Sequence, residues 1–231
     1  SRQTLGWRFA SGDDREAVGG MIVEAAKQES LTITPPDLVT VPEVFRRADG
    51  TSRFRPRHGV VFTSETLLAA EARLLARAAD MTAPVIDLDV IARVTRKEHL
   101  LSAEQSETLA GIAVSGRPVD LLVGPAGAGK TTAMHALKTA WVKAHGKGSV
   151  VGLAPSAVAA QVLAEDLGIA CENTAKWLHE HDRGRAELGK GQLVIIDEAT
   201  LAGTLTLDRL TALAAEAGAK VLLVGDWAQL Q

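Results

Sequence analysis

The sequence predicts an α/β fold in which a parallel β-sheet carries helices on both faces. One observation is a set of four short apolar runs, separated by helical segments, at 119–123, 150–154, 193–196 and 221–224. Strands buried on both faces of a parallel sheet have this continuously apolar character. A second observation is a glycine-rich loop at 124–131, between the first run and a helical segment. We therefore expect an α/β domain over 99–231, preceded by a small α+β accessory domain over 1–98.

Composition excludes several classes of protein. The chain has 231 residues and a formal net charge of -3, which describes a folded protein rather than a disordered or strongly basic one. Its single cysteine, Cys171, excludes an internal disulfide and fits a reducing compartment. No apolar run approaches the roughly 20 residues that span a membrane, and no signal-peptide pattern is present. We expect a cytoplasmic protein with no membrane partner.

The first sixty residues contain signals for a helix and a hairpin. A helix is predicted over 14–29, and two β-rich runs at 38–45 and 60–63 surround Asp49-Gly50, a strong hairpin signal. Two interpretations of the arginines around this hairpin stay open, a solvated charged edge and a surface that contacts phosphates. These arginines are Arg46, Arg47, Arg53, Arg55 and Arg57.

Three further helix starts precede the glycine loop. Ser64 is a candidate N-cap for a helix that ends near Ala79, and Pro84 opens a second short helix. Ser102 with Gln105 three residues later forms a capping box, in which each side chain bonds the other residue's backbone. That local role explains Gln105 without any ligand.

The glycine loop has the pattern of a phosphate-binding loop. Strand, loop and helix follow one another, as that motif requires, and the alternative is a glycine-rich turn ahead of an ordinary helix. Glycines let backbone N–H groups point at an anion, to which the helix N-terminus adds its positive end. Lys130 is expected to reach the β/γ-phosphates of ATP, and the Thr131 hydroxyl to bind Mg²⁺. The loop residues are Gly124, Pro125, Ala126, Gly127, Ala128, Gly129, Lys130 and Thr131.

Two carboxylates directly follow the third apolar run. Ligands of open parallel sheets bind beyond the carboxyl ends of strands, so Asp197 and Glu198 are expected near the glycine loop. Asp197 is expected to hold Mg²⁺ through its water shell, and Glu198 to orient or deprotonate an attacking water. After the fourth run, Asp226 is expected to support the metal and its waters, and Gln229 to donate to the γ-phosphate.

Taken in order, these segments resemble the first motor domain of superfamily 1 DNA helicases of the 5′-to-3′, RecD-like branch. Within that branch the chain is most similar to the helicase part of conjugative relaxase–helicases of the TraI/TrwC type. The resemblance covers roughly 100–231 and implies a RecA-like sheet. The residues that carry it are Gln105, Gly124 to Thr132, 154–160, Thr174 with Trp177-Leu178, 197–200, and Gly225-Asp226 with Gln229-Leu230.

The resemblance implies further roles. Gln105 would contact the adenine of ATP, and Thr132 would belong to the phosphate site. Pro155, Ser156 and Thr174 would contact phosphates of single-stranded DNA, which position the strand without reading its sequence. Ser156 and Thr174 are also good N-caps, so both interpretations stay open.

Other residues near these positions have simpler explanations. Trp177 is more typical of a core residue than of a base-stacking one. His179, His181 and Asp182 are more typical of a solvated helix end than of a metal cluster, because they lack a cysteine partner.

The chain departs from the family in two ways. It contains no tyrosine, so the tyrosine-dependent nicking chemistry of relaxases is not expected. The second motor domain, whose arginine fingers are typically worth about 10³–10⁵ in rate, is absent from the sequence. We therefore expect this chain to bind ATP, to hydrolyse it hardly at all and not to translocate. Two other classes stay open, a P-loop small-molecule kinase and a nucleotide-dependent binding module.

Overall fold

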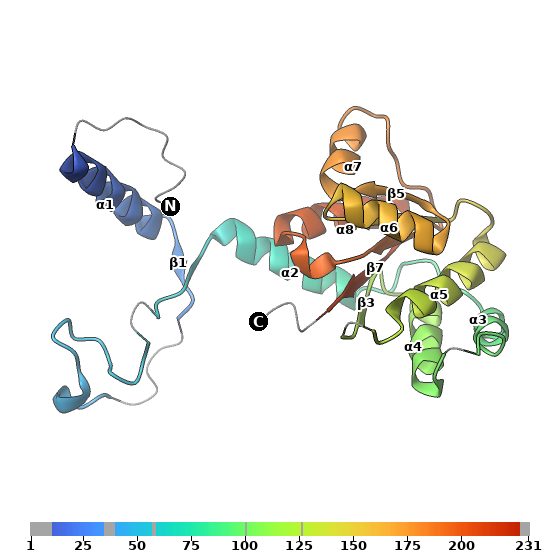
Figure 1. Cartoon of the computed structure of the whole chain (residues 1–231), viewed down its shortest axis with the longest axis horizontal. Helices are drawn as coiled ribbons and strands as arrows, with labels where there is room; N and C mark the ends of the chain where they lie inside the picture. Colours follow the sequence, from blue (N-terminus) through green and yellow to red (C-terminus); the bar gives the residue numbers. More distant parts are fainter. Residues whose placement is uncertain (1–10, 35–39, 57–58, 100, 126, 227–231) are drawn as a thin grey trace. The chain divides into compact units, whose positions relative to one another are not determined.

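The computed structural model describes residues 11–34, 40–56, 59–99, 101–125 and 127–226 (Figure 1). The chain divides into two compact units, Ser1–Ala69 and Ala70–Gln231. In the ranges given above, none of the helices is both long and apolar enough to cross a bilayer.

The first unit contains the predicted N-terminal helix. Helix α1 (Gly12–Gln28) starts two residues earlier than expected, because the Ser11 hydroxyl caps it by accepting from the Asp14 amide at 3.1 Å. Strand β1 (Leu31–Thr32) follows α1 and pairs antiparallel with β2 (Phe62–Thr63). No residue of α1 is buried, so this helix adds little to a core.

The predicted pairing of 38–45 with 60–63 is wrong. Part of the first run, 38–39, lies outside the described residues, and its end forms the short 3-10 helix η1 (Glu43–Phe45). Pro42, which precedes η1, has a fixed φ and no amide to donate to a ladder. The second run instead pairs with β1. The turn itself is present, because Gly50 has a φ of 80° and a bridge joins Arg46 to Ser52.

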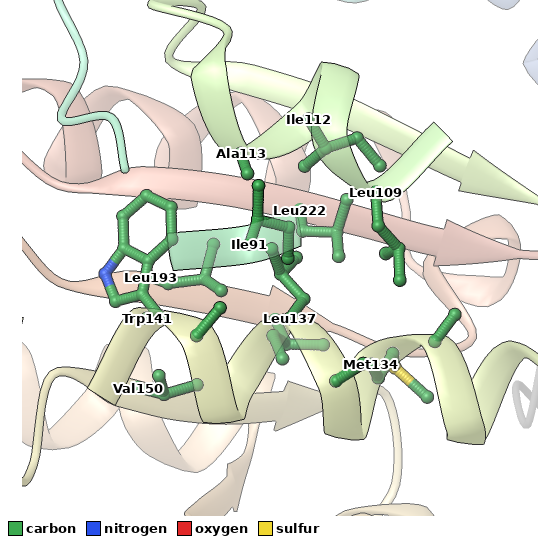
Figure 2. Close-up of a cluster of buried hydrophobic side chains, with 14 of the residues drawn as sticks. Ile91, Leu109, Ile112, Ala113, Met134, Leu137, Trp141, Val150, Leu193 and Leu222 are labelled. Atoms are coloured by element: carbon green, nitrogen blue, oxygen red, sulfur yellow. The ribbon is translucent and has the colours of Figure 1, made fainter. Parts of the chain in front are cut away.

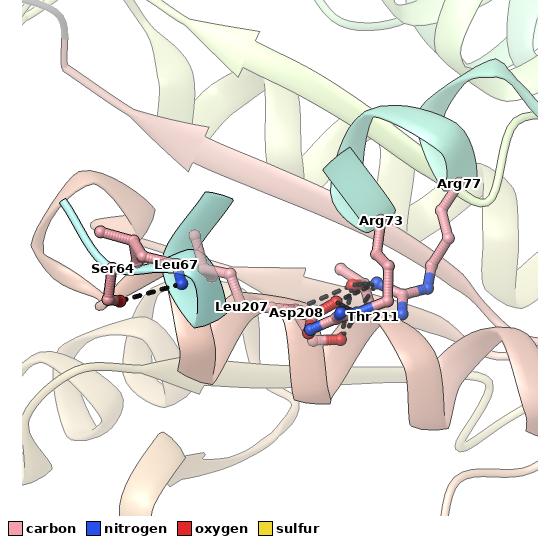
Figure 3. A network of polar contacts seen from close by, with 7 residues as sticks. All are labelled: Ser64, Leu67, Arg73, Arg77, Leu207, Asp208 and Thr211. Carbon is pink, nitrogen blue, oxygen red and sulfur yellow. Dashed lines mark hydrogen bonds and ion pairs between the residues drawn. The ribbon is translucent and has the colours of Figure 1, made fainter. Parts of the chain in front are cut away.

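Two helices follow, of which one begins as predicted. Helix α2 (Glu65–Ala79) starts after Ser64, whose hydroxyl accepts from the Leu67 amide at 3.1 Å (Figure 3). The helix expected from Pro84 begins later, as α3 (Leu88–Thr95) with Asp87 at its N-cap. The Ile86 amide instead donates to Ala113 O at 2.8 Å, which holds that segment against the last turn of α4 (Ala103–Val114).

The second unit is built on a five-stranded parallel sheet, so the predicted fold class is confirmed. The four predicted strands are present, with a fifth one at an edge. The order across the sheet is β3 (Val119–Val123), β7 (Lys220–Gly225), β6 (Leu193–Ile196), β4 (Val150–Ala154) and β5 (Ala170–Asn173). Because all strands run parallel, their carboxyl ends meet at one side of the sheet.

Hydrophobic clusters cover both faces of this sheet. On one face, α3, α4, α5 (Lys130–His145) and α6 (Ala157–Leu167) contribute to a single core. Figure 2 shows Trp141 and Leu137 of α5 packed over the strands that carry Leu193 and Leu222. The opposite face packs against α7 (Thr174–His181) and α8 (Thr204–Ala217). Alternate residues of β6 and β7 point to the two clusters, as expected of strands buried on both faces.

A buried ion pair fixes the amino ends of two neighbouring strands. Lys220, at the start of β7, is fully buried, and its ammonium lies 2.7 Å from the carboxylate of Asp120 in β3. The same ammonium donates to Ser115 O at 2.5 Å and Arg117 O at 3.0 Å. Burial lowers the pKa of Lys220, and the bond to Asp120 opposes that effect. The chain entering β3 is thereby held on β7, at the end of the sheet away from the glycine loop.

A second polar cluster joins α2 to α8 within the second unit. Arg73 and Arg77 both donate to the carboxylate of the buried Asp208, at 2.6 and 2.7 Å (Figure 3). Arg77 also bonds the Thr211 hydroxyl at 3.1 Å. Hydrogen bonds from the two arginines lower the pKa of Asp208, which therefore stabilises the fold as a carboxylate.

Asp208→Asn is expected to lower the free energy of unfolding at neutral pH by about 1.5–3 kcal/mol, because charged hydrogen bonds are lost from a buried site. A group whose folded pKa is depressed stabilises the fold above its unfolded pKa, and this contribution disappears as the pH falls through the folded value. The difference between parent and variant, measured by urea denaturation, should therefore be full at pH 7 and shrink below about pH 4. Asp182→Asn, which removes an exposed ion pair with Arg209, should change little at any pH.

Gly152→Ala is expected to lower the melting temperature. A β-carbon at this position of β4 would lie 2.3 Å from Cys171 Sγ and 2.8 Å from Leu163 Cδ2. Overpacking of this kind typically costs about 1–3 kcal/mol. Adding Cys171→Ala should recover part of the loss, and Gly111→Ala in α4, where nothing lies within 4 Å, should be neutral or stabilising. An unchanged melting temperature for Gly152→Ala would contradict this packing.

Candidate nucleotide-binding site

The glycine loop lies between the end of β3 and the start of α5. Gly127 and Gly129 have φ values of 77° and 75°, in the left-handed region that glycine tolerates. Gly129 is also the N-cap of α5, and a β-carbon there would lie 2.8 Å from Gln105 Nε2. Both positions therefore require glycine for backbone reasons. Ala126 lies outside the described residues.

Lys130 begins α5 and folds back over the loop. Its ammonium donates to Gly124 O at 2.5 Å and to Pro125 O at 2.9 Å. A cation held on the loop carbonyls, beside the N-terminus of a helix, is placed to receive an anion. Thr131, on the first turn of the same helix, is exposed, and Thr132 is half-buried.

Asp197 and Glu198 form a tight turn at the carboxyl end of β6. The Asp197 carboxylate accepts from the Glu198 amide at 2.9 Å. Glu198 has a φ of 48°, and among the described residues no other non-glycine residue has a positive φ. Backbone strain of this kind is typical of functional sites and costs on the order of 1–3 kcal/mol. The turn continues into the 3-10 helix η2 (Ala199–Leu201).

The electrostatics of Asp197 connect this turn to the glycine loop. Burial raises the pKa of the Asp197 carboxyl, whereas the Glu198 amide and the positive charge of Lys130 lower it. The negative charge of Asp166, in α6, adds to the rise. Lys130 and Asp197 are thus close enough to influence each other, as the sequence predicts.

The side chains at this site fit a magnesium ion that takes only one or two ligands from the protein. Within the described part of the chain, no three His, Cys, Asp or Glu side chains converge on a metal site. Mg²⁺ usually takes one or two protein oxygens, with phosphates and waters completing its shell. The half-buried Asp197 carboxylate and the exposed Thr131 hydroxyl are hard oxygen donors of this kind.

Gln105 lies against the loop and is already engaged. Its Oε1 accepts from the Ser102 amide at 2.8 Å, which confirms the predicted capping box. Its Nε2 donates to Ala128 O at 2.7 Å. A cavity of about 370 Å³ is lined by this start of α4, the end of β3 and, from the loop, Gly124, Pro125 and 128–130. The predicted adenine contact stays a prediction, located beside this cavity.

The end of β7 reaches the same place. Gly225 pairs with Val123 of β3, and its carbonyl accepts from the Gly124 amide at 3.3 Å. Asp226 follows and is buried. Gln229 lies outside the described residues.

Thr200, in the range 197–200 that carries the resemblance, has no role predicted for its side chain. A β-carbon on Gly225 would lie 2.9 Å from the Thr200 methyl group, so Thr200 packs directly on the end of β7. Its hydroxyl oxygen is buried and, among the described residues, has no hydrogen-bond partner. The glycine at 225, required by this close approach, is the only sequence signal for that contact.

The three predicted DNA-binding residues follow two neighbouring strands. Ala154 of β4 pairs with Asn173 of β5, so Pro155-Ser156 and Thr174 emerge side by side. Ser156 caps α6 by accepting from the Ala159 amide at 3.0 Å. The N-cap of α7, however, is Asn173, whose side chain accepts from the Lys176 amide at 2.7 Å. The N-cap interpretation of Thr174 is therefore wrong, and Thr174 is instead buried.

The aromatic and histidine residues of α7 have structural contacts. Trp177 packs against the cluster on the α8 face and stacks on His181 with ring centroids 5.3 Å apart. His181 Nδ1 lies 2.8 Å from Ala186 O, and Asp182 pairs with Arg209. Trp177 is thus partly buried as predicted, whereas His181 packs against it and is not fully solvated.

Comparison with known proteins places this geometry in a family. A family profile described as an AAA domain matches residues 100–231. A probable conjugal transfer protein TraA of Sinorhizobium fredii is 32% identical over 173 residues, which cover 74% of this chain and 15% of that protein. The conjugal transfer protein TraA of Agrobacterium fabrum is 31% identical over 199 residues, 84% of this chain and 18% of that protein.

A conjugal transfer protein TraA of Rhizobium radiobacter is 38% identical over 136 residues, or 59% of this chain and 12% of that protein. The chain thus spans less than a fifth of the length of these curated relatives. The family profile covers more than half of the chain. The chain therefore belongs to this AAA-domain family, and its resemblance to the RecD-like superfamily 1 motor domain of conjugative proteins is confirmed.

Proposed function

We propose that the chain is the ATP-binding first motor domain of a 5′-to-3′ single-stranded-DNA translocase or helicase, in a conjugative relaxase–helicase. The observation that carries the proposal is the proximity of Lys130 to Asp197 beyond the carboxyl ends of β3 and β6. The conjugal transfer relatives support the conjugative setting. The motor would occupy 99–231 with 1–98 as an accessory segment, and would act in the cytoplasm with a second motor domain of the same polypeptide.

ATP would bind by replacing hydrogen bonds that Lys130 makes to the loop carbonyls. The Lys130 ammonium donates to Gly124 O and Pro125 O, and phosphate oxygens are stronger acceptors because they carry charge. The loop amides and the N-terminus of α5 would hold the remaining phosphate oxygens. Gln105 would turn from the Ala128 carbonyl toward the adenine.

Hydrolysis would need three groups around the γ-phosphate. Glu198 would orient or deprotonate the attacking water, and Lys130 would stabilise the charge that develops on the phosphate oxygens. Gln229 would report the loss of the γ-phosphate. Thr131 and Asp197 would hold Mg²⁺, whose charge neutralises the phosphates when it is bound.

Single-stranded DNA would lie across the ends of β4 and β5. The Ser156 hydroxyl accepts a bond from Ala159, so its own hydrogen is available to donate to a phosphate. Pro155 and Thr174 would shape the adjoining backbone around the strand. Contacts of this type do not read sequence, which suits a motor that must pass along any strand.

The structure offers little support for the kinase alternative. Such enzymes close a lid of basic residues over the acceptor, and Arg183 and Arg185 are the candidates for it. Arg185 is paired with Glu180, with Nε 2.5 Å from Oε2, and thus has a local structural partner.

Mg-ATP is expected to raise the melting temperature of the parent chain by about 5–10 °C when ATP exceeds its dissociation constant about 100-fold. Lys130→Ala is expected to remove most of this shift, because the phosphates lose their cation. Lys143→Ala, a matched change at the exposed end of the same helix, should keep it. Differential scanning fluorimetry gives the measurement. A full shift in Lys130→Ala, or no shift in the parent, would refute the nucleotide site.

Asp197→Asn is expected to remove the part of the ATP-dependent shift that requires Mg²⁺, because a neutral amide is a weaker ligand than a carboxylate. The comparison is ATP with Mg²⁺ against ATP with EDTA. Burial raises the pKa of Asp197, so in the parent this Mg²⁺-dependent part should decline on acidification at a higher pH than for an ordinary aspartate. Asp182→Asn should behave like the parent, and an unaltered Mg²⁺ dependence in Asp197→Asn would contradict the assignment.

A further inference from the structure

The turn segment 40–56 of the first unit presents two phenylalanine rings to solvent. Phe45 is 45% exposed and Phe54 is 73% exposed. Their ring centroids lie 5.2 Å apart with an interplanar angle of 43°. Because both rings are exposed, they contribute little hydrophobic stabilisation to the fold. Exposed apolar surface of this kind is typical of interaction sites.

Hydrogen bonds fix the backbone beneath these rings. The Phe54 amide donates to the buried Ser52 hydroxyl at 3.1 Å, and the Arg53 amide donates to Phe45 O at 2.8 Å. The Arg47 guanidinium donates to Ser52 O and Arg55 O, both at 2.6 Å, and so connects the two arms of the turn. The backbone that carries the rings is therefore ordered before any ligand arrives, which lowers the entropy cost of binding.

The same segment is strongly basic in an otherwise slightly acidic chain. Residues 46–57 contain five arginines and one aspartate, which gives a local charge of +4 against -3 for the whole chain. The aspartate, Asp49, is occupied by its own turn, where it accepts from the Thr51 amide at 2.9 Å and the Thr51 hydroxyl at 2.6 Å. Arg46 and Arg53, the neighbours of the two rings in the chain, are exposed.

We propose that this aromatic-basic turn, formed by Phe45, Arg46, Arg53 and Phe54, binds single-stranded nucleic acid. Bases would stack on the two rings, and the guanidinium groups would contact the phosphates. Single strands fit better than duplexes, because paired bases cover the faces that an aromatic ring would use. Every base has such a face, so binding would be tolerant of sequence. This surface is separate from the nucleotide site, and the proposal does not depend on ATP binding.

The test is the binding of a labelled oligothymidylate of about 15 nucleotides to the full chain without ATP, followed by fluorescence anisotropy. Phe54→Ala is expected to weaken binding about tenfold through the loss of one stacked base, and Phe54→Trp to restore it. Arg53→Ala is expected to weaken binding and to reduce its salt dependence by the equivalent of about one phosphate. An oligouridylate arm distinguishes DNA from RNA as the preferred strand.

The matched control is Phe62→Ala, which removes the same side chain from β2 of the same unit, where it is 40% exposed. It should bind like the parent, and a duplex of equal length should bind at least about tenfold more weakly than the single strand. Circular dichroism checks that each variant is folded. Cross-linking of a bromouracil-substituted strand, with the attached peptide identified by mass spectrometry, should modify the segment that holds Phe45 and Phe54.

Several outcomes would overturn the proposal. Parent-like binding by both Phe54→Ala and Arg53→Ala would show that the turn is a solvated charged surface that does not bind the nucleic acid. Loss of binding in Ser156→Ala alone would show that the oligonucleotide binds to the second unit and not to the turn. Equal competition by anionic lipid vesicles would indicate a general anion-binding surface without base stacking. A failure of ATP to bind would affect none of these measurements, so the two proposals fail separately.

Discussion

The burial of β6 and β7 on both faces is the constraint on which the site depends. Every residue of these two strands is buried, so neither strand can slip in register without exposing apolar side chains or burying polar ones. β7 lies between β3 and β6, and neighbouring strands are about 4.8 Å apart. The glycine loop and the Asp197 turn are therefore held about two strand spacings apart, roughly 10 Å. That separation leaves room for a phosphate chain while Lys130 still acts on Asp197.

The elements that the sequence predicts well are those whose stability comes from burial. The runs at 150–154, 193–196 and 221–224 form strands whose residues are nearly all removed from water, whereas β3, at one edge of the sheet, leaves Leu121 and Val123 exposed. The fifth strand, β5, was missed because Ala170 to Asn173 is half polar and lies at an edge, where one side stays open. The run at 38–45 does not form the predicted strand, because its apolar residues favour a strand but Pro42 precedes a 3-10 helix instead. Local sequence preferences thus determine β5 and the 38–45 segment, whereas burial determines the central strands of the sheet.

The candidate site likewise contains features that the sequence predicts and contacts that it does not. The positions of the glycine loop and the Asp197 turn were predictable because these segments directly follow β3 and β6, whose carboxyl ends lie at the same side of the sheet. The contact of Thr200 with Gly225 was not predictable, because it joins the 3-10 helix η2 to the end of β7, and no sequence pattern links these two segments. The cluster of Arg73 and Arg77 with Asp208 spans more than 130 residues of sequence. Packing of α2 on α8 creates it, and no periodicity of either helix reveals the partner.

The polar groups of the site bond mainly to one another, which bears on the kind of ligand that can bind there. Lys130 uses two loop carbonyls, Gln105 uses a third, and Asp197 accepts the amide of Glu198. A neutral ligand would have to displace these bonds with no gain in charge, and would bind weakly. A triphosphate with its cation brings both signs of charge, so it compensates Lys130 and Asp197 together. The Asp197 carboxylate also accepts the amide of Glu198, whose backbone is strained, so the proposed metal ligand is coupled to the residue proposed to activate water.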